Sequence, residues 1–244
     1  MMLVLDIGNT RVKWGVREGG RWRARGTTAS RPLETLPARL AALPGASVVA
    51  YSNVAGSAAD RAVAALAAAT GARRVRIVSQ AAGCGVRNGY ADPRQLGSDR
   101  WAALVAAWSL VRGPAVVVNA GTAATVDLLD GSGNFIGGII CPGIGLMLDS
   151  LQRRSRVLRA GAGRVRETPP RNTADAMQTG AVLALAGAIE AMVRRLEARC
   201  GSEPRLVLSG GDAPLLKGLG KRTRRVNDLV LEGVALLANE ALRR

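Results

Sequence analysis

The alternation of apolar and polar residues predicts a β-hairpin at the start of the chain. Residues 3–5 form a short apolar run that ends at Asp6, and residues 7–10 have the small and polar character of a turn. Apolar and other residues then alternate over 12–16. Alternation with a period of two is typical of a strand with one buried face. The first 16 residues are therefore expected to form strand, turn and strand.

The same arrangement recurs near the middle of the chain. Residues 116–129 again read as an apolar strand, a glycine-containing turn and a second strand. Aligning Asp6 with Asn119 also aligns Gly8 with Gly121, so each half opens with a strand, an acid or amide, a glycine and small polar residues. This repetition indicates an internal duplication.

Further elements follow each hairpin in a similar order. The spacing of apolar residues, together with glycines and prolines that mark turns, predicts additional strands over 20–28, 47–52, 75–79, 134–140 and 205–209. Helices are predicted over 32–43, 57–70, 98–111, 146–154, 172–199 and 228–242, with Ser57 as an N-cap and Asp60 three residues on. The order β-β-β-α-β-α then occurs twice, which predicts an α/β protein with two halves, residues 1–112 and 113–244, and a cleft between them.

Composition limits the classes of protein to consider. The 244 residues are 48% hydrophobic, enough to bury a substantial core. The formal net charge is +16, but the excess consists of arginines spread along the whole chain rather than gathered in one segment. A nucleic-acid-binding protein usually concentrates its positive charge on one face. Specific nucleic-acid binding is therefore not expected.

The absence of histidine excludes several kinds of active site. Without it there is no Ser-His-Asp triad, no Cys-His dyad and no His-ligated zinc. The cysteines Cys84, Cys141 and Cys200 form no CxxC pair, which argues against a zinc site or a disulfide framework.

The first apolar run lacks the basic region of a signal peptide, and glycines and a proline interrupt the uncharged stretch 131–148. A cytoplasmic protein without a membrane span is expected.

The two glycine turns suggest phosphate binding. A glycine lets the backbone approach a ligand closely, and successive N–H groups form a nest for an anion. Each turn alone could simply reverse the chain, but a pair at the head of each half favours the functional interpretation. No GxxxxGK[ST] sequence occurs, and no GxGxxG follows the first strand, so neither a P-loop nor a dinucleotide fold is indicated.

Several segments resemble a known family. Segments 6–13 and 119–127 are similar to the two phosphate motifs of the acetate and sugar kinase/Hsp70/actin superfamily. One segment closely resembles a motif of type III pantothenate kinases, namely residues 89–101. Other motifs of this family are similar to residues 137–143, 172–173 and 209–212. The resemblance implies a duplicated actin-like (ribonuclease H-like) α/β fold with an ATP cleft between the halves. It also implies ATP-dependent phosphorylation of pantothenate to 4'-phosphopantothenate, the first step of coenzyme A biosynthesis.

The resemblance also implies roles for individual residues. Asp6 would hold Mg²⁺, and contacts to ATP are carried over to Asp6, Ile7, Gly8, Asn9, Thr10, Arg11, Val12, Lys13, Thr122, Gly210 and Gly211. Asp99 would be the general base and Arg100 would pair with the pantothenate carboxylate or the transferring phosphoryl group. Contacts to pantothenate are carried over to Tyr90, Gly97, Ser98, Asp99, Arg100 and Thr173.

Structural alternatives exist for several of these residues. Asp6 could cap a turn, and Lys13 could be a solvated strand residue. Ser98 or Asp99 could be the N-cap of the helix over 98–111, and Thr173 could be the N-cap of the long helix. Gly210 and Gly211 could serve only a tight turn between a strand and a helix.

One position departs from the family pattern. The family commonly has Asp where this chain has Asn119, and that Asp helps to bind an activating K⁺ or NH₄⁺ ion. The amide keeps an oxygen ligand but removes the negative charge, so weaker activation by a monovalent cation is expected. The family also implies a homodimer.

Two other functions compete with the pantothenate kinase hypothesis. One is a regulatory accessory factor that retains the kinase fold, motivated by the net charge and Asn119. The other is a sugar or acetate kinase, which the loop over 89–101 argues against.

Overall fold

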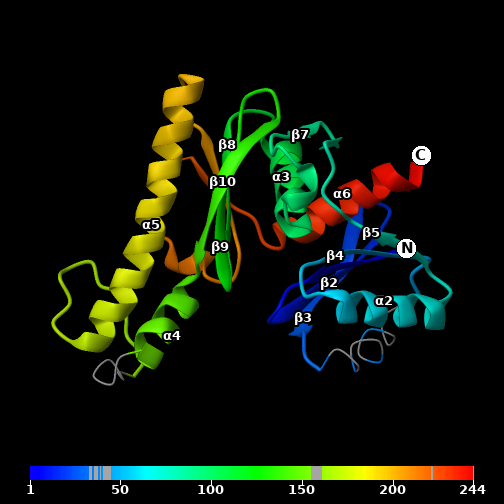
Figure 1. The fold of residues 1–244 in the computed structure, drawn as a ribbon, viewed down its shortest axis with the longest axis horizontal. Coiled ribbons are helices and arrows are strands. Elements are labelled where there is room, and N and C mark those ends of the chain that lie inside the picture. Colours follow the sequence, from blue (N-terminus) through cyan, green and yellow to red (C-terminus); the bar gives the residue numbers. More distant parts are fainter. Residues whose placement is uncertain are drawn as a thin grey trace. The chain divides into compact units, whose positions relative to one another are not determined.

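The structure is a computed structural model that describes residues 1–32, 35, 38, 40, 45–154, 161–220 and 222–243 (Figure 1). Most of the helix predicted over 32–43 lies outside the described residues. The chain divides into two compact units. Unit 1 consists of Met1–Leu110 together with Asp228–Arg244, and unit 2 consists of Val111–Asn227.

Unit 1 is built on a sheet in the order β3-β2-β1-β4-β5. Its strands are β1 (Met2–Ile7), β2 (Arg11–Glu18), β3 (Arg21–Ala29), β4 (Val48–Asn53) and β5 (Arg73–Arg76). The first three strands pair antiparallel, whereas β4 and β5 join the sheet in parallel. Unit 1 also contains α2 (Ser57–Thr70), the short pair β6 (Ala82–Gly83) and β7 (Val86–Asn88), η2 (Pro93–Gln95), α3 (Ser98–Val111) and α6 (Leu229–Arg243).

The period of two along β1 assigns its residues to two different faces. Leu3, Leu5 and Ile7 belong to a buried cluster that includes Val63 and Leu66 of α2. The alternate residues of β1 point to the opposite face, and α6 contacts β1, β2 and β4 without joining that cluster. The face opposite α2 is therefore the one on which Asp6 lies.

Unit 2 repeats this topology. Strands β12 (Thr223–Arg225), β11 (Arg205–Ser209), β8 (Ala115–Ala120), β9 (Ala123–Leu129) and β10 (Asn134–Pro142) lie next to one another in that order. Strands β8, β9 and β10 pair antiparallel, and β11 and β12 are parallel to β8. Order and direction match β5-β4-β1-β2-β3 of unit 1, which supports the predicted duplication.

The core of unit 2 lies between its sheet and a long helix. Unit 2 contains α4 (Ile144–Arg154), α5 (Thr173–Cys200) and η3 (Ala213–Leu215), and α5 packs against β8 and β9 (Figure 1). By length and composition alone α5 could cross a membrane, with a mean hydropathy of 1.5. However, Leu185, Ile189 and Leu196 are fully buried in the core of unit 2. This burial is the pattern of a core helix.

Three of the differences between the structure and the sequence expectations concern helices. We expected residues 228–242 to belong with the second half, but α6 packs on β1, β2 and β4 of unit 1. The N-cap of α2 is Gly56 rather than Ser57, and no side chain caps this helix. Among the described residues between β11 and β12, unit 2 has the short η3 where unit 1 has α2.

Candidate active site

Three polar residues gather where β1 and β4 end. Asp6 is paired across the antiparallel ladder with Lys13 of β2 and across the parallel ladder with Ser52 of β4. Directly paired residues point to the same face of a sheet, so all three lie on the face opposite α2. Ser52 is fully buried, while Asp6 and Lys13 are partly exposed. The register of the strands thus brings a carboxylate, an ammonium group and a hydroxyl together.

The surroundings of Asp6 raise its pKa from 3.8 to about 7. Burial is the largest cause, because it penalises the charged carboxylate. The negative charge of Asp99 comes next, the positive charge of Lys13 opposes it, and that of Asp228 adds a smaller increase. Two predicted site residues, Asp6 and Asp99, are therefore close enough to interact electrostatically.

Asp99 is fixed at the start of α3. The helix begins at Ser98, and the Trp101 N–H donates to the Gly97 carbonyl at 2.9 Å, so neither Ser98 nor Asp99 is the N-cap. The Asp99 Oδ1 accepts the Arg100 N–H at 2.8 Å. A Cβ at Gly97 would lie 2.6 Å from this oxygen, so only glycine leaves the carboxylate in place. These contacts orient Asp99 through backbone geometry.

Ser98 has a partner within the protein. Its hydroxyl lies 2.8 Å from the hydroxyl of Ser52. Since Ser52 is the parallel neighbour of Asp6, this hydrogen bond ties the first turn of α3 to the strand beside Asp6. Ser98, which the family resemblance assigns to pantothenate, thus also positions Asp99 relative to the sheet.

Arg100 and Tyr90 are in contact with each other. Arg100 is buried, its Nη1 donates to the Tyr90 hydroxyl at 3.1 Å, and its guanidinium lies 5.7 Å from the ring centroid. The Tyr90 N–H donates to Asn88 Oδ1 at 3.1 Å, which holds the loop. A buried guanidinium offers several N–H donors in a fixed fork, which suits a carboxylate or phosphoryl oxygen.

The first turn has exposed residues at its tip and buried residues on both sides. The Gly8 N–H donates to the Arg11 carbonyl at 3.1 Å, and the Ser30 hydroxyl donates to the Gly8 carbonyl at 2.6 Å. Asn9, Thr10 and Arg11 are exposed. By contrast, the side chains of Ile7 and Val12 are fully buried in the core, so only their backbone could meet a nucleotide.

The second turn is held by a different glycine. The Gly121 N–H donates to the Ala123 carbonyl at 3.2 Å, and Thr122 is exposed. The Gly143 N–H donates to the Thr122 carbonyl at 2.9 Å, and a Cβ at Gly143 would collide with the Gly121 carbonyl. Gly143 therefore supports the shape of this turn from the end of β10.

The two glycines after β11 have different surroundings. Gly210 has φ +105°, and a Cβ there would collide with the Ala120 backbone at the end of β8. The Asp212 N–H also donates to the Ala120 carbonyl, at 3.0 Å. Gly211 is exposed and has no atom within 4 Å of the Cβ position. Gly210 is therefore required for close backbone packing, while Gly211 leaves open space for a ligand.

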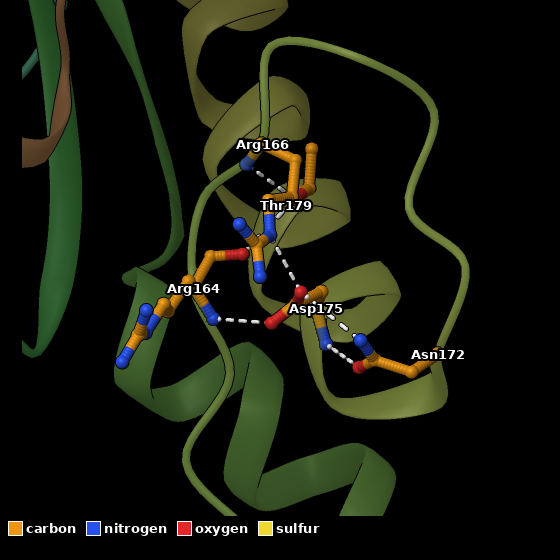
Figure 2. Close-up of polar contacts among 5 residues, drawn as sticks. All are labelled: Arg164, Arg166, Asn172, Asp175 and Thr179. Atoms are coloured by element: carbon orange, nitrogen blue, oxygen red, sulfur yellow. Dashed lines mark hydrogen bonds and ion pairs between the residues drawn. The ribbon is translucent and has the colours of Figure 1, made fainter.

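Thr173 does not cap α5, because Asn172 does. The Asn172 Oδ1 accepts the Asp175 N–H at 2.9 Å, and Thr173 is exposed as the first helical residue. Figure 2 shows how Asp175 then holds the preceding loop: it accepts the Arg164 N–H at 2.7 Å and Arg166 Nε at 2.6 Å. These bonds lower the pKa of Asp175 to about 2, the Arg164 N–H contributing most.

A cavity of about 290 Å³ lies next to this network in unit 2. It is lined by residues of α4, the loop before α5 and the first turns of α5, namely Leu148, Gln152, Gly161, Ala162, Gly163, Ala174, Met177 and Gln178. Gly163 is needed here because a Cβ would collide with the Ala174 carbonyl. Thr173 directly precedes one lining residue, which places it at the edge of a hollow surface.

Comparison with known sequences identifies the family. A sequence model of the type III pantothenate kinase family matches residues 2–195. The type III pantothenate kinase of Aromatoleum aromaticum is 46% identical over 241 residues, which cover 98% of each chain. The chain belongs to the type III pantothenate kinase family. It is therefore a kinase, and the expectation of an enzyme is confirmed.

Solved structures show the same fold as this kinase at low identity. A Campylobacter jejuni protein assigned to the Baf family of transcriptional activators is 18% identical, with a TM-score of 0.67, covering 99% of this chain and 100% of that one. A Sinorhizobium meliloti protein assigned as a 2-dehydro-3-deoxygalactonokinase is 17% identical, with a TM-score of 0.63 and 99% coverage of both chains. Together with the topology, these likenesses confirm the duplicated actin-like α/β fold.

The kinase family works with ATP and a divalent metal, and the residues near Asp6 fit that requirement. Among the described residues, no group of three or more Cys, Asp or Glu could hold a metal ion by itself. Mg²⁺ often binds through only one or two carboxylates, with substrate phosphates and water completing the shell. Burial, the largest cause of the raised pKa of Asp6, penalises its charged carboxylate, and a divalent cation bound there would offset that penalty.

Sequence reasoning missed one charged partner in the kinase. Lys13 Nζ lies 3.2 Å from Asp228 Oδ1, an ion pair between β2 and the residue that precedes α6. Nothing in the spacing of Lys13 and Asp228 in the sequence indicates that they meet. The sequence pattern places Asp228 only at the start of the last predicted helix.

Proposed function

We propose that this kinase transfers the γ-phosphoryl group of ATP to the primary hydroxyl of pantothenate, giving 4'-phosphopantothenate, the first step of coenzyme A biosynthesis. The observation that carries the proposal is that, in a member of the type III pantothenate kinase family, Ser52 lies beside Asp6 and its hydroxyl is 2.8 Å from that of Ser98, the neighbour of Asp99. Phosphoryl transfer requires mainly positioning and charge neutralisation, together with a group that accepts the hydroxyl proton.

In this proposal Asp99 accepts the proton of the pantothenate hydroxyl. Its carboxylate is oriented by the Arg100 N–H, and Gly97, which has no Cβ, leaves room for it in this position. A general base must be within hydrogen-bond reach of the proton it removes, and a fixed carboxylate meets that requirement without reorganisation.

Arg100 and Tyr90 would bind pantothenate. The Arg100 guanidinium is buried and positioned by the Tyr90 hydroxyl, so its planar fork is organised before a substrate carboxylate arrives. Gly97, Ser98 and Thr173 would complete the pantothenate contacts. Thr173 is available for this role because Asn172 takes over the capping of α5.

The glycine turns would bind the phosphates of ATP. In unit 1 the exposed residues Asn9, Thr10 and Arg11 supply donors, and Lys13 supplies a positive charge. In unit 2 Thr122 contributes from the second turn, while Gly211 leaves room for the adenosine. Mg²⁺, held by Asp6, would neutralise the charge of the phosphates and of the leaving group.

Other properties of the kinase extend this proposal. We expect a homodimer, as the family resemblance implies; Leu146, Leu151 and Leu183 of α4 and α5 are 42–63% exposed and are apolar side chains that an interface would cover. A cytoplasmic location and no specific nucleic-acid binding are proposed as well. The role of a regulatory accessory factor is not favoured, because the likeness to the Baf-family protein shows the fold alone.

The direct test is transfer of labelled phosphate from ATP to pantothenate by the purified kinase and by Asp99→Asn. We expect a loss of about 100-fold or more in kcat for the variant, because a positioned general base contributes roughly that much. Ser109→Ala, on the same helix α3 but with its hydroxyl bound to the Ala106 carbonyl, is the control. An Asp99→Asn enzyme as fast as the wild type would remove Asp99 from the reaction.

A further inference from the structure

Asp228 has a cation at each of its carboxylate oxygens. Its Oδ1 lies 3.2 Å from Lys13 Nζ, and its Oδ2 lies 3.9 Å from Arg25 Nη1. The three side chains are between a quarter and a third exposed. An isolated surface ion pair contributes little, but a network with fixed members can orient a group. The network therefore raises the question of what keeps Arg25 in place.

Arg25 is held by an aromatic ring and a second carboxylate. Its guanidinium lies 4.7 Å from the ring centroid of Trp22, and its Nη2 lies 3.4 Å from Glu232 Oε1. The same oxygen accepts the Trp22 Nε1–H at 2.6 Å. A Cβ at Gly15 would lie 2.6 Å from the Trp22 ring, so glycine is needed for the ring to lie flat against β2. The Trp22 ring and the Glu232 carboxylate thus hold the guanidinium that faces Asp228.

The backbone at Asp228 is also unusual. Its φ of +54° is in the left-handed region, which non-glycine residues seldom occupy. The Glu232 N–H donates to the Asp228 carbonyl at 3.3 Å, so α6 starts directly from this conformation. Aspartate tolerates the left-handed region better than most residues. This backbone conformation fixes the direction in which the Asp228 side chain leaves the chain towards Lys13.

We propose that Asp228 is a positioning residue that acts through Lys13. Lys13 lies directly opposite Asp6 on β2, and its charge acts on the Asp6 carboxylate. A free lysine side chain has many rotamers, and fixing them on binding costs conformational entropy. The ion pair with Asp228 holds the ammonium group near Asp6 before ATP arrives. This inference rests on the proposed role of Lys13 as a ligand of the ATP phosphates.

A double-mutant cycle tests the inference. We would measure steady-state phosphorylation of pantothenate by the wild type, Lys13→Met, Asp228→Asn and the double variant, varying ATP and pantothenate separately. We expect Asp228→Asn to raise the KM for ATP by about tenfold with an unchanged KM for pantothenate, because only preorganisation towards ATP is lost. In the Lys13→Met background, Asp228→Asn should have no further effect.

Two further variants serve as controls. Glu18→Gln removes another carboxylate of the same hairpin, one that pairs with the exposed Arg23 at 3.0 Å, and should leave both KM values unchanged. Asp228→Gly removes the carboxylate while keeping a residue that readily adopts positive φ. It should reproduce the kinetics of Asp228→Asn, and it keeps the test valid if the amide variant does not fold.

The outcomes separate the two claims. An equal effect of Asp228→Asn with and without Lys13 would overturn the positioning role and leave the function of Lys13 intact. An unchanged KM for ATP in both Asp228 variants would overturn it too. An unchanged KM for ATP in Lys13→Met would overturn the phosphate role of Lys13 and the positioning role with it, while activity towards pantothenate would still support the proposed reaction.

Discussion

Three paired positions, one on each of three neighbouring strands, occur in both units, but only in unit 1 do they carry charged residues. In unit 1 Asp6 is paired with Lys13 and Ser52, and in unit 2 the equivalent positions are Asn119, Thr125 and Ser209. The backbone pairing is the same, whereas an acid and a base are replaced by an amide and a hydroxyl. The duplicated fold thus supplies two glycine turns, and unit 1 alone adds ionic groups at these positions.

This difference indicates a division of labour. Backbone N–H groups of a turn can bind phosphate oxygens without any charged side chain. A metal ion and a proton acceptor need carboxylates, and Asp6 and Asp99 both belong to unit 1. We infer that unit 1 provides the groups that take part in the chemistry, while unit 2 contributes mainly binding contacts.

Changing Asp6 to the amide of unit 2 should have the largest effect. In Asp6→Asn the negative charge at the end of β1 is lost, and with it the proposed ligand of Mg²⁺. We expect kcat/KM for ATP to fall by about 100-fold or more, because metal stabilisation of a phosphoryl transition state is worth several kcal/mol. Initial rates over a range of Mg²⁺ concentrations would measure this. Activity close to that of the wild type would refute the division of labour.

Adding a methyl group at the two glycines after β11 should separate packing from binding. Gly210→Ala combines positive φ with a collision against Ala120, so we expect the free energy of unfolding to fall by about 2–4 kcal/mol. Gly211→Ala is the matched control, because its Cβ position is open, and its stability should stay within about 0.5 kcal/mol of the wild type. Urea denaturation would compare the two. Equal losses of stability would contradict the assignment of Gly210 to packing.

Two carboxylates, one in each unit, should give opposite dependences of stability on pH. The pKa of Asp6 is raised to about 7, so its favourable contribution is complete below pH 3.8 and is lost as pH rises through about 7. The pKa of Asp175 is lowered to about 2, so its contribution is present above pH 3.8 and is lost as pH falls through about 2.

Denaturation of nucleotide-free protein at a series of pH values would test this contrast. Compared with the wild type, Asp6→Asn should remove a decline in stability between pH 4 and 7, of the order of a few kcal/mol. Asp175→Asn should instead weaken the protein at neutral pH and flatten its loss of stability in acid. Curves that shift in the same direction for both variants would show that these environments have been misassigned.

The smallest effect is expected where unit 2 is made to resemble unit 1. Asn119→Asp restores a negative charge at the end of β8, and a carboxylate is a stronger ligand of K⁺ than an amide. We expect little difference between wild-type rates with and without K⁺, and a modest stimulation by K⁺ in the variant. Coupled assays in potassium and sodium buffers would measure both. Strong K⁺ dependence of the wild type would contradict the effect assigned to Asn119.

Local signals predicted the local parts of this structure well. The strand over 205–209 and the helices over 57–70 and 98–111 have the predicted bounds, because apolar periodicity and flanking turn residues act within a few residues. The long helix was expected from residue 172, which proved to be its N-cap, and it ends at Cys200 before Gly201 in the left-handed conformation. Ser57 was wrongly predicted as a cap because Gly56 can occupy the same place.

Contacts between distant segments could not be predicted in the same way. Trp22 and Glu232 are 210 residues apart, and nothing in either local sequence indicates their hydrogen bond. The pairing of Lys13 with Asp228 and the packing of α6 on unit 1 likewise join segments that are far apart in the sequence. The separate roles of Gly210 and Gly211 also emerge only when the backbone of β8 is in place.

The sequence by itself determined the duplicated strand and turn pattern, the family, and the residues available for phosphoryl transfer, because these depend on periodicity and on motifs read along the chain. Only the tertiary structure decided which carboxylates meet, which glycines are packed against another backbone, and which unit the last helix joins. Electrostatic and steric interactions depend on distance in space, and that distance is set by the pairing of strands far apart in the sequence.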